Sequence, residues 1–155
     1  MANQNASLFA ARAATPQSMV RANQNGGALR CFFATFTNPA SGGVAMTEHI
    51  KWGTLPIGAR VVGGYMTWST GTASCTLNLG DPATPTRYAA ATAVTTAGTL
   101  ALTPPATNAL GLAGHEVAVA QVGAATDQSE IRSVCAGAVV AAGQTITLCL
   151  FYVTD

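Results

Sequence analysis

The stretch VCAGAVVAAGQTITLCLFYV, residues 134–153, decides the fold class of this chain. Its twenty residues carry no charge, so a hydropathy window would mark it as a membrane-spanning helix. Two features oppose that interpretation. Ala141-Ala142-Gly143-Gln144 places a polar, flexible break in the middle, and the flanks lack the Lys/Arg bias of an anchored helix. The second half of the stretch therefore decides whether it forms a helix or a strand.

Residues 144–153 alternate with a period of two. One side of the alternation is made of large apolar residues and the other of mixed residues: Ile146, Leu148, Leu150 and Tyr152 against Thr145, Thr147, Cys149, Phe151 and Val153. Alternating β-branched and aromatic residues are typical of a strand. The pattern predicts a strand here and no membrane span.

The remaining chain from residue 28 onward has the same character, with short runs of strand-forming residues separated by Gly, Pro and Asn. The further strands that we expect cover residues 28–37, 44–52, 59–70, 73–79, 87–96, 98–102, 116–122 and 131–137. Within residues 59–70, the pair Gly63-Gly64 marks a bulge or a close backbone approach. Eight or nine short strands without a convincing amphipathic helix predict an all-β fold, an antiparallel β-sandwich or jelly roll.

Residues 1–27 differ from the rest of the chain. They are rich in Ala, Gln, Asn and Ser, and Gly26-Gly27 closes the segment. Such a segment has little apolar surface with which to pack on its own domain, so we expect an extended N-terminal arm over residues 1–27 and a β-sandwich domain over residues 28–155. No basic segment followed by an apolar stretch occurs near the start, so no secretory signal peptide is expected.

The composition points to association. Of 155 residues, 31 are Ala and 21 are Thr, while only 8% are charged and the net charge is +1. An average soluble domain is about 25% charged. Seven scattered basic residues cannot easily build the basic face of a nucleic-acid binder. Threonine suits solvent-facing strand positions and alanine allows close approach of sheets or subunits, so we expect contacts with copies of the chain or with a partner.

The sequence offers little catalytic chemistry. The two histidines, His49 and His115, lie next to Glu48 and Glu116, but no HExxH, GxSxG or Asp-x-Asp pattern connects them. We therefore expect surface or interface histidines, and neither an enzyme nor a catalytic, cofactor or metal site.

The four cysteines, Cys31, Cys75, Cys135 and Cys149, contain no CxxC motif. We expect reduced thiols that act as small core residues in a protein assembled in a cytoplasm. Their even number leaves disulfides open, because pairing cannot be deduced from spacing.

Residues 50–90 carry the most specific motifs. They contain LPIGARVVGG at residues 55–64, LNLGD at residues 77–81 and TRYAA at residues 86–90, and the closing strand adds I-x-L-x-L-x-Y at residues 146–152. These motifs resemble those of small tailed-bacteriophage capsid decoration (cement) proteins encoded near the major capsid protein. The resemblance covers about two-thirds of the chain.

The resemblance implies a structural virion protein, a β-sandwich that binds the outer capsid surface and stabilises contacts between major capsid protein subunits. It implies a homotrimer whose partners are the major capsid protein and further copies of the chain, with no nucleic acid, membrane or cofactor. The location it implies is the capsid surface of a virion assembled in the cytoplasm of a bacterial host.

Three other functions remain open from the residues. The same fold could serve in a phage tail or fibre base. A protein of another class, a glycan- or small-molecule-binding β module, would use Trp52, Trp68 and the loop at residues 103–116. An enzyme built on His49 or His115 is the weakest candidate.

Overall fold

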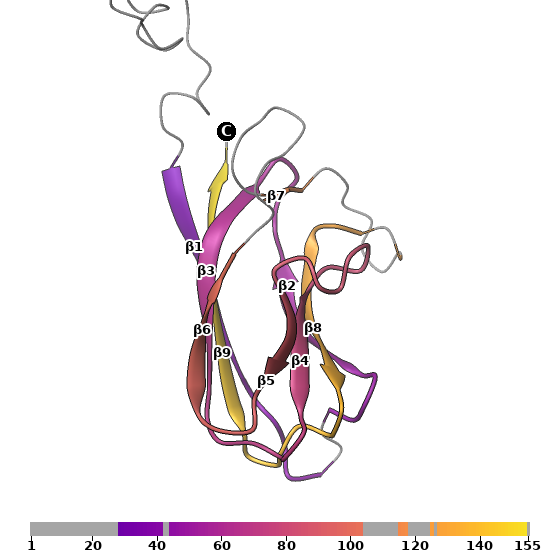
Figure 1. Cartoon of the computed structure of the whole chain (residues 1–155). Coiled ribbons are helices and arrows are strands. Elements are labelled where there is room, and N and C mark those ends of the chain that lie inside the picture. Colours follow the sequence, from indigo (N-terminus) through magenta and orange to yellow (C-terminus); the bar gives the residue numbers. More distant parts are fainter. Residues whose placement is uncertain (1–27, 42–43, 104–114, 118–124, 126, 155) are drawn as a thin grey trace, which may run out of the picture.

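The computed structural model describes residues 28–41, 44–103, 115–117, 125 and 127–154, which form nine strands in two antiparallel sheets and contain no helix (Figure 1). Sheet A contains, in order, β1 (Ala28–Thr37), β9 (Thr145–Thr154), β3 (Arg60–Trp68) and β6 (Gly98–Leu102), with β7 (His115–Glu116) pairing with β3. Sheet B contains, in order, β2 (His49–Thr54), β8 (Glu130–Ala136), β4 (Thr76–Gly80) and β5 (Ala89–Ala93). The predicted all-β class is confirmed.

The two sheets face each other as the layers of a sandwich (Figure 1). The chain crosses between them after β1, β2 and β3, forms a hairpin from β4 to β5, and crosses again after β5, β7 and β8. With the two-residue β7 set aside, each sheet has four strands, and this alternation is the connectivity of a jelly roll.

Most predicted strands are found with small shifts at their ends. β1 and β6 match the predicted bounds, and β9 is shifted by one residue. The strand predicted over residues 44–52 is wrong in its first half, because β2 begins at His49. Before it, the Glu48 carboxylate accepts a hydrogen bond of 2.8 Å from the Ala45 amide, and Thr47 has a φ of 70°. This side-chain hydrogen bond favours a turn over an extended chain. Most of the predicted strand 116–122 lies outside the described residues.

The Gly63-Gly64 pair lies at an irregularity, as predicted. The register of β3 against β9 shifts between Val61 and Gly63, which is a β-bulge. At Gly64, a Cβ atom would overlap the Cys149 carbonyl oxygen on β9 and lie 3.0 Å from the Leu150 Cα atom. Only glycine lets the two backbones approach this closely.

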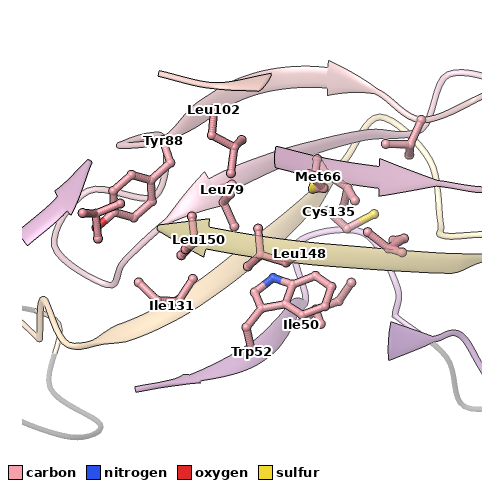
Figure 2. Packing of buried hydrophobic residues seen from close by; sticks show 14 of the residues in the cluster. Ile50, Trp52, Met66, Leu79, Tyr88, Leu102, Ile131, Cys135, Leu148 and Leu150 are labelled. Carbon is pink, nitrogen blue, oxygen red and sulfur yellow. The ribbon is translucent and has the colours of Figure 1, made fainter. Parts of the chain in front are cut away.

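The core lies between the sheets and is made of inward-facing apolar side chains (Figure 2). The largest fully buried ones include Met66, Ile146, Leu148 and Leu150 of sheet A and Leu77, Leu79 and Ile131 of sheet B. The alternation predicted for β9 is confirmed, because three of the four residues on its predicted apolar side are fully buried and Tyr152 packs against the cluster. Burying each side chain of this size stabilises the fold by about 1.5–3 kcal/mol.

The uncharged stretch 134–153 divides between β8, a loop and β9. In the loop, Gly143 has a φ of 74°, its amide donates to the Asn38 carbonyl (2.8 Å), and the Gln144 amide donates to the Ala141 carbonyl (3.1 Å). This is the break predicted from Ala141-Ala142-Gly143-Gln144. In the part of the chain that the structure describes, there is no helix with the length and apolar character needed to cross a membrane.

Candidate interaction surface

The two histidines lie on different sheets. His49 is exposed at the start of β2, where it pairs with Val134 of β8. His115 lies on β7, opposite Val61 of β3. Among the residues with described positions, no three His, Cys, Asp or Glu side chains come close enough to hold a metal ion.

Trp52 and Trp68, the tryptophans of the glycan-binding alternative, both make contacts within the fold. Trp52 is 9% exposed, its indole donates a 2.8 Å hydrogen bond to the Ser133 hydroxyl, and its ring meets the Phe36 ring edge-on at 6.4 Å. Trp68 donates to the Thr96 carbonyl (2.7 Å), and its ring closely covers Gly98. Trp52 therefore offers no open ring face for a sugar. The loop at residues 103–116 falls largely outside the described residues.

The motif at residues 77–90 covers most of β4, the β4–β5 connection and the start of β5. Asp81 is fully buried, and its carboxylate accepts hydrogen bonds from the Thr84 amide (2.8 Å) and from the Arg87 guanidinium. The Arg87 guanidinium also donates to the Thr84 hydroxyl (3.0 Å). Gly80 precedes this turn because a Cβ there would overlap the Thr84 carbonyl. The motif therefore fixes a loop conformation.

Burial in the same loop affects Tyr88. Its side chain is 3% exposed and packs into the core (Figure 2). Desolvation, and secondarily the nearby Asp81 charge, raise the pKa of Tyr88 well above its ordinary value, and Arg87 partly offsets this. The phenol is thus held neutral as part of the core.

A small hollow lies where the β1–β2 and β8–β9 connections meet. Its volume is about 290 Å³. It is lined by Asn38, Pro39, Ala40, Val44, Ala45, Val139, Val140 and Ala142. The Asn38 side chain holds the surrounding loops together, because its amide nitrogen donates to the Val140 carbonyl (2.8 Å) and its amide oxygen accepts from the Val44 backbone amide (3.0 Å). None of the lining side chains is titratable, so the hollow has no catalytic group.

The outer face of sheet A carries an apolar patch. Residues paired in register share a face, so Leu29, Cys31 and Phe33 of β1 lie beside Val153, Phe151 and Cys149 of β9, with Tyr65 of β3 next to Cys149. We call Leu29, Cys31, Phe33, Tyr65, Phe151 and Val153 the apolar outer patch. Leu29 is 65% exposed and Phe33 64% exposed, and the rings of Tyr65 and Phe151 meet edge-on at 6.2 Å. Exposed apolar side chains gathered in this way mark interaction sites.

The other half of the same face is covered by threonine. This threonine field consists of Thr35, Thr37, Thr67, Thr99, Thr145 and Thr147. Hydroxyls pair across the strands, from Thr35 to Thr147 at 3.1 Å and from Thr37 to Thr145 at 3.2 Å. The expectation that threonine covers strand positions facing solvent is confirmed on this face.

β1 also forms an edge of sheet A. It pairs with β9 on one side, and within the described ranges no strand pairs with its other side. Ten residues of edge with one charged side chain, Arg30, present a row of backbone groups to which another chain can add. Sequence reasoning placed this strand but missed its exposed face. The signal was available, because the segment ALRCFFATFT is apolar on both of its alternating sides.

The cysteine prediction needs a correction. Cys75 and Cys135 are buried thiols of the core, as expected, whereas Cys149 is buried on the outer face of sheet A and Cys31 is exposed. The reason is its place on the outward side of an edge strand, which no other strand of the described residues covers.

Comparison with known proteins adds the fold relationship. No family model and no curated protein matches the sequence. A chain of the cyanophage Pam1 capsid asymmetric unit superposes with a TM-score of 0.64 and 21% identity, covering 84% of this chain and 87% of that one. A chain of the Ralstonia phage GP4 capsid gives a TM-score of 0.52 and 22% identity, covering 84% and 85%. The protein thus shares its jelly-roll fold with chains from the capsids of two bacteriophages.

Proposed function

We propose that this protein is a bacteriophage capsid decoration protein, which binds the outer surface of an assembled capsid and stabilises contacts between major capsid protein subunits. The observation that carries the proposal is the fold likeness to chains of two phage capsids, which extends over 84% of this chain. A structural role also agrees with the 8% content of charged residues. The role requires no catalytic site, cofactor, nucleic acid or membrane.

The apolar outer patch supplies the binding energy. Leu29 and Phe33 are each about two-thirds exposed in the single chain, so a partner that covers them removes most of their apolar surface from water. Full burial of such a side chain contributes about 1.5–3 kcal/mol. A protein that binds only the assembled shell stabilises that shell over free subunits by mass action.

The copies of the chain form a homotrimer, and residues 1–27 act as an arm that contacts a neighbouring subunit. The edge of β1, which pairs with no other strand among the described residues, supports association, because it offers backbone hydrogen bonds beside the apolar outer patch. The arm is supported by the composition of residues 1–27, which are rich in Ala, Gln, Asn and Ser and offer little apolar surface for packing on their own domain. Such a segment is available to a neighbour.

Sedimentation with capsids tests the proposal. Capsids of the phage that encodes this chain, assembled without it, are mixed with the purified protein and pelleted. The wild type is expected to co-sediment, and Phe33→Lys to bind at least tenfold more weakly, about 1.4 kcal/mol. Thr37→Lys is the matched control, because it places the same charge on the same face of β1 within the threonine field. Absence of the wild type from the pellet, or virion density on the tail instead of the capsid, would refute the proposal.

Two measurements test the arm and the trimer. Deleting residues 1–25 is expected to weaken capsid binding without changing the circular dichroism spectrum or the melting temperature, and full capsid occupancy by this variant would contradict the role of the arm. Light scattering is expected to give about 47 kDa, three times the 15.6 kDa chain mass. A stable monomer at micromolar concentration would exclude the trimer.

A further inference from the structure

Two of the four cysteines are neighbours on the outer face of sheet A. Cys31 of β1 is opposite Phe151, and Cys149 of β9 is opposite Phe33, so the two cysteines lie diagonally across adjacent strands on one face. Their sulfur atoms are 2.7 Å apart, and both are free thiols. This separation is shorter than the roughly 3.5–4.0 Å of an ordinary non-bonded contact. A disulfide bond is about 2.05 Å long.

The two thiols differ in access. Cys31 is exposed, whereas Cys149 is 3% exposed. Tyr65, directly opposite Cys149 on β3, forms a hydrogen bond with its thiol. A reagent in solution therefore reaches Cys31 first and finds Cys149 directly beside it.

We propose that Cys31 and Cys149 form an oxidisable pair that closes to a disulfide and covalently links the edge strand β1 to β9. The inference rests on the sulfur geometry and the strand register, and it is independent of the proposed function. It adds a modification site to the apolar outer patch.

The oxidant is a small disulfide such as oxidised glutathione. The Cys31 thiolate attacks one sulfur of the reagent, forming a mixed disulfide and releasing one glutathione thiolate. The Cys149 thiolate then attacks the Cys31 sulfur, forming the intramolecular bond and releasing the second glutathione. The protein loses two protons and two electrons, and the reagent's disulfide is reduced to two thiols.

The environment makes this reaction slow at neutral pH. The hydrogen bond with Cys149, assisted by desolvation, raises the pKa of Cys31 to about 11. The thiolate fraction, and with it the rate of the first step, therefore rises about tenfold per pH unit below that value. Tyr65 is the titratable group that faces the pair from β3, while Arg60 and Glu116 lie further along the sheet at the register of Val153.

The other two cysteines provide an internal contrast. Cys75 and Cys135 are on the core side of sheet B, 0% and 1% exposed, and the Cys135 thiol donates to the Ala138 carbonyl at 3.0 Å. Burial, together with the neighbouring Cys135, raises the pKa of Cys75 to about 12. Neither thiol is accessible to a reagent while the protein stays folded, so both are expected to remain reduced.

The link would restrain the unfolded chain strongly. It joins residues 118 positions apart, and closing a long loop reduces the entropy of the unfolded state. Strain in a diagonal cross-strand bond offsets part of this gain. We expect the oxidised protein to melt roughly 5–10 °C higher than the reduced one.

The experiment uses the full chain, purified under reductant and then incubated with oxidised glutathione at pH 8.5. The expected result is the loss of two of the four thiols and of two hydrogens from the intact mass. Digestion with chymotrypsin, without reduction, should yield a peptide pair linked through Cys31 and Cys149. Trypsin is unsuitable because Cys135 and Cys149 share the peptide that follows Arg132.

Variants separate the two steps. Cys149→Ser should accumulate glutathione on Cys31, because the second step has no attacking thiol. Cys31→Ser should keep its remaining thiols, and Cys75→Ser, the matched control, should still form the link. The proposal is overturned if the wild type accumulates the mixed disulfide without closing it, if the link forms between two chains, or if Cys75 and Cys135 oxidise instead. The chymotryptic map of the wild type decides this even if a variant fails to fold.

Discussion

Gly64→Ala is expected to destabilise the protein strongly, because the added Cβ has no room. At this position of β3 the Cβ would overlap the Cys149 carbonyl oxygen and lie 3.0 Å from the Leu150 Cα atom. Both contacts are with the backbone of β9, which cannot move aside as a flexible side chain could. Gly64 is also paired with Leu102 of β6 on its other side, so moving it disturbs two strand pairs in the middle of sheet A.

The size of the effect follows from these contacts. Relieving the overlap weakens one or two backbone hydrogen bonds, at about 0.5–1.5 kcal/mol each. Alanine at the Gly64 φ of 156° adds about 1–3 kcal/mol of backbone strain. The free energy of unfolding should fall by about 3 kcal/mol, and the melting temperature by about 6–12 °C for a chain of this length.

The adjacent glycine supplies the control. A Cβ at Gly63 would meet only the Phe151 ring, at 4.0 Å. Gly63→Ala should therefore change the free energy of unfolding by less than about 1 kcal/mol, because it mainly reduces the freedom of the unfolded chain. Urea unfolding of both variants, followed by circular dichroism, measures the difference. Equal stability losses in the two variants would refute the reasoning from backbone contact.

Two further predictions concern buried ionisable groups. Asp81→Asn should lower the free energy of unfolding by about 3 kcal/mol, because Arg87 loses a buried carboxylate. Lys51→Gln breaks an ion pair in which the lysine side chain is 61% exposed and the Glu130 side chain 8% exposed, and it should cost less, because water reaches the Lys51 end of the pair. Equal losses of the two variants in urea unfolding would contradict this distinction. The second concerns Cys75, whose pKa rises from 9.0 to about 12 on folding. Above pH 9 the unfolded chain loses this proton first, so stability falls as pH rises from 9 to 12. Under reductant, the free energy of unfolding of the wild type should fall by on the order of 1 kcal/mol more than that of Cys75→Ala between pH 8 and 10. Parallel pH profiles of the two proteins would contradict this prediction.

The interaction surface was only partly predictable. Low charge and abundant small residues indicated association, and the turn residues around residues 28–37 predicted the strand that is β1. Which side of β1 would be exposed was not predictable, because Leu29 and Phe33 on one side and Phe32 and Phe36 on the other are equally apolar in sequence. Burial resolves it, since the Phe32 and Phe36 side packs against the core.

The sequence by itself determined the local elements of this protein. Period-two alternation identified β9, turn residues bounded β1 and β6, and the glycine pair marked the bulge of β3, because each signal is contained within a few neighbouring residues. Only the tertiary structure decided that β1 is an edge strand, that Asp81 and Arg87 fix a loop, and that Cys31 lies beside Cys149. The edge position of β1 and the cysteine contact depend on the pairing of β1 with β9, two segments more than one hundred residues apart. No local pattern specifies which distant strand becomes the neighbour.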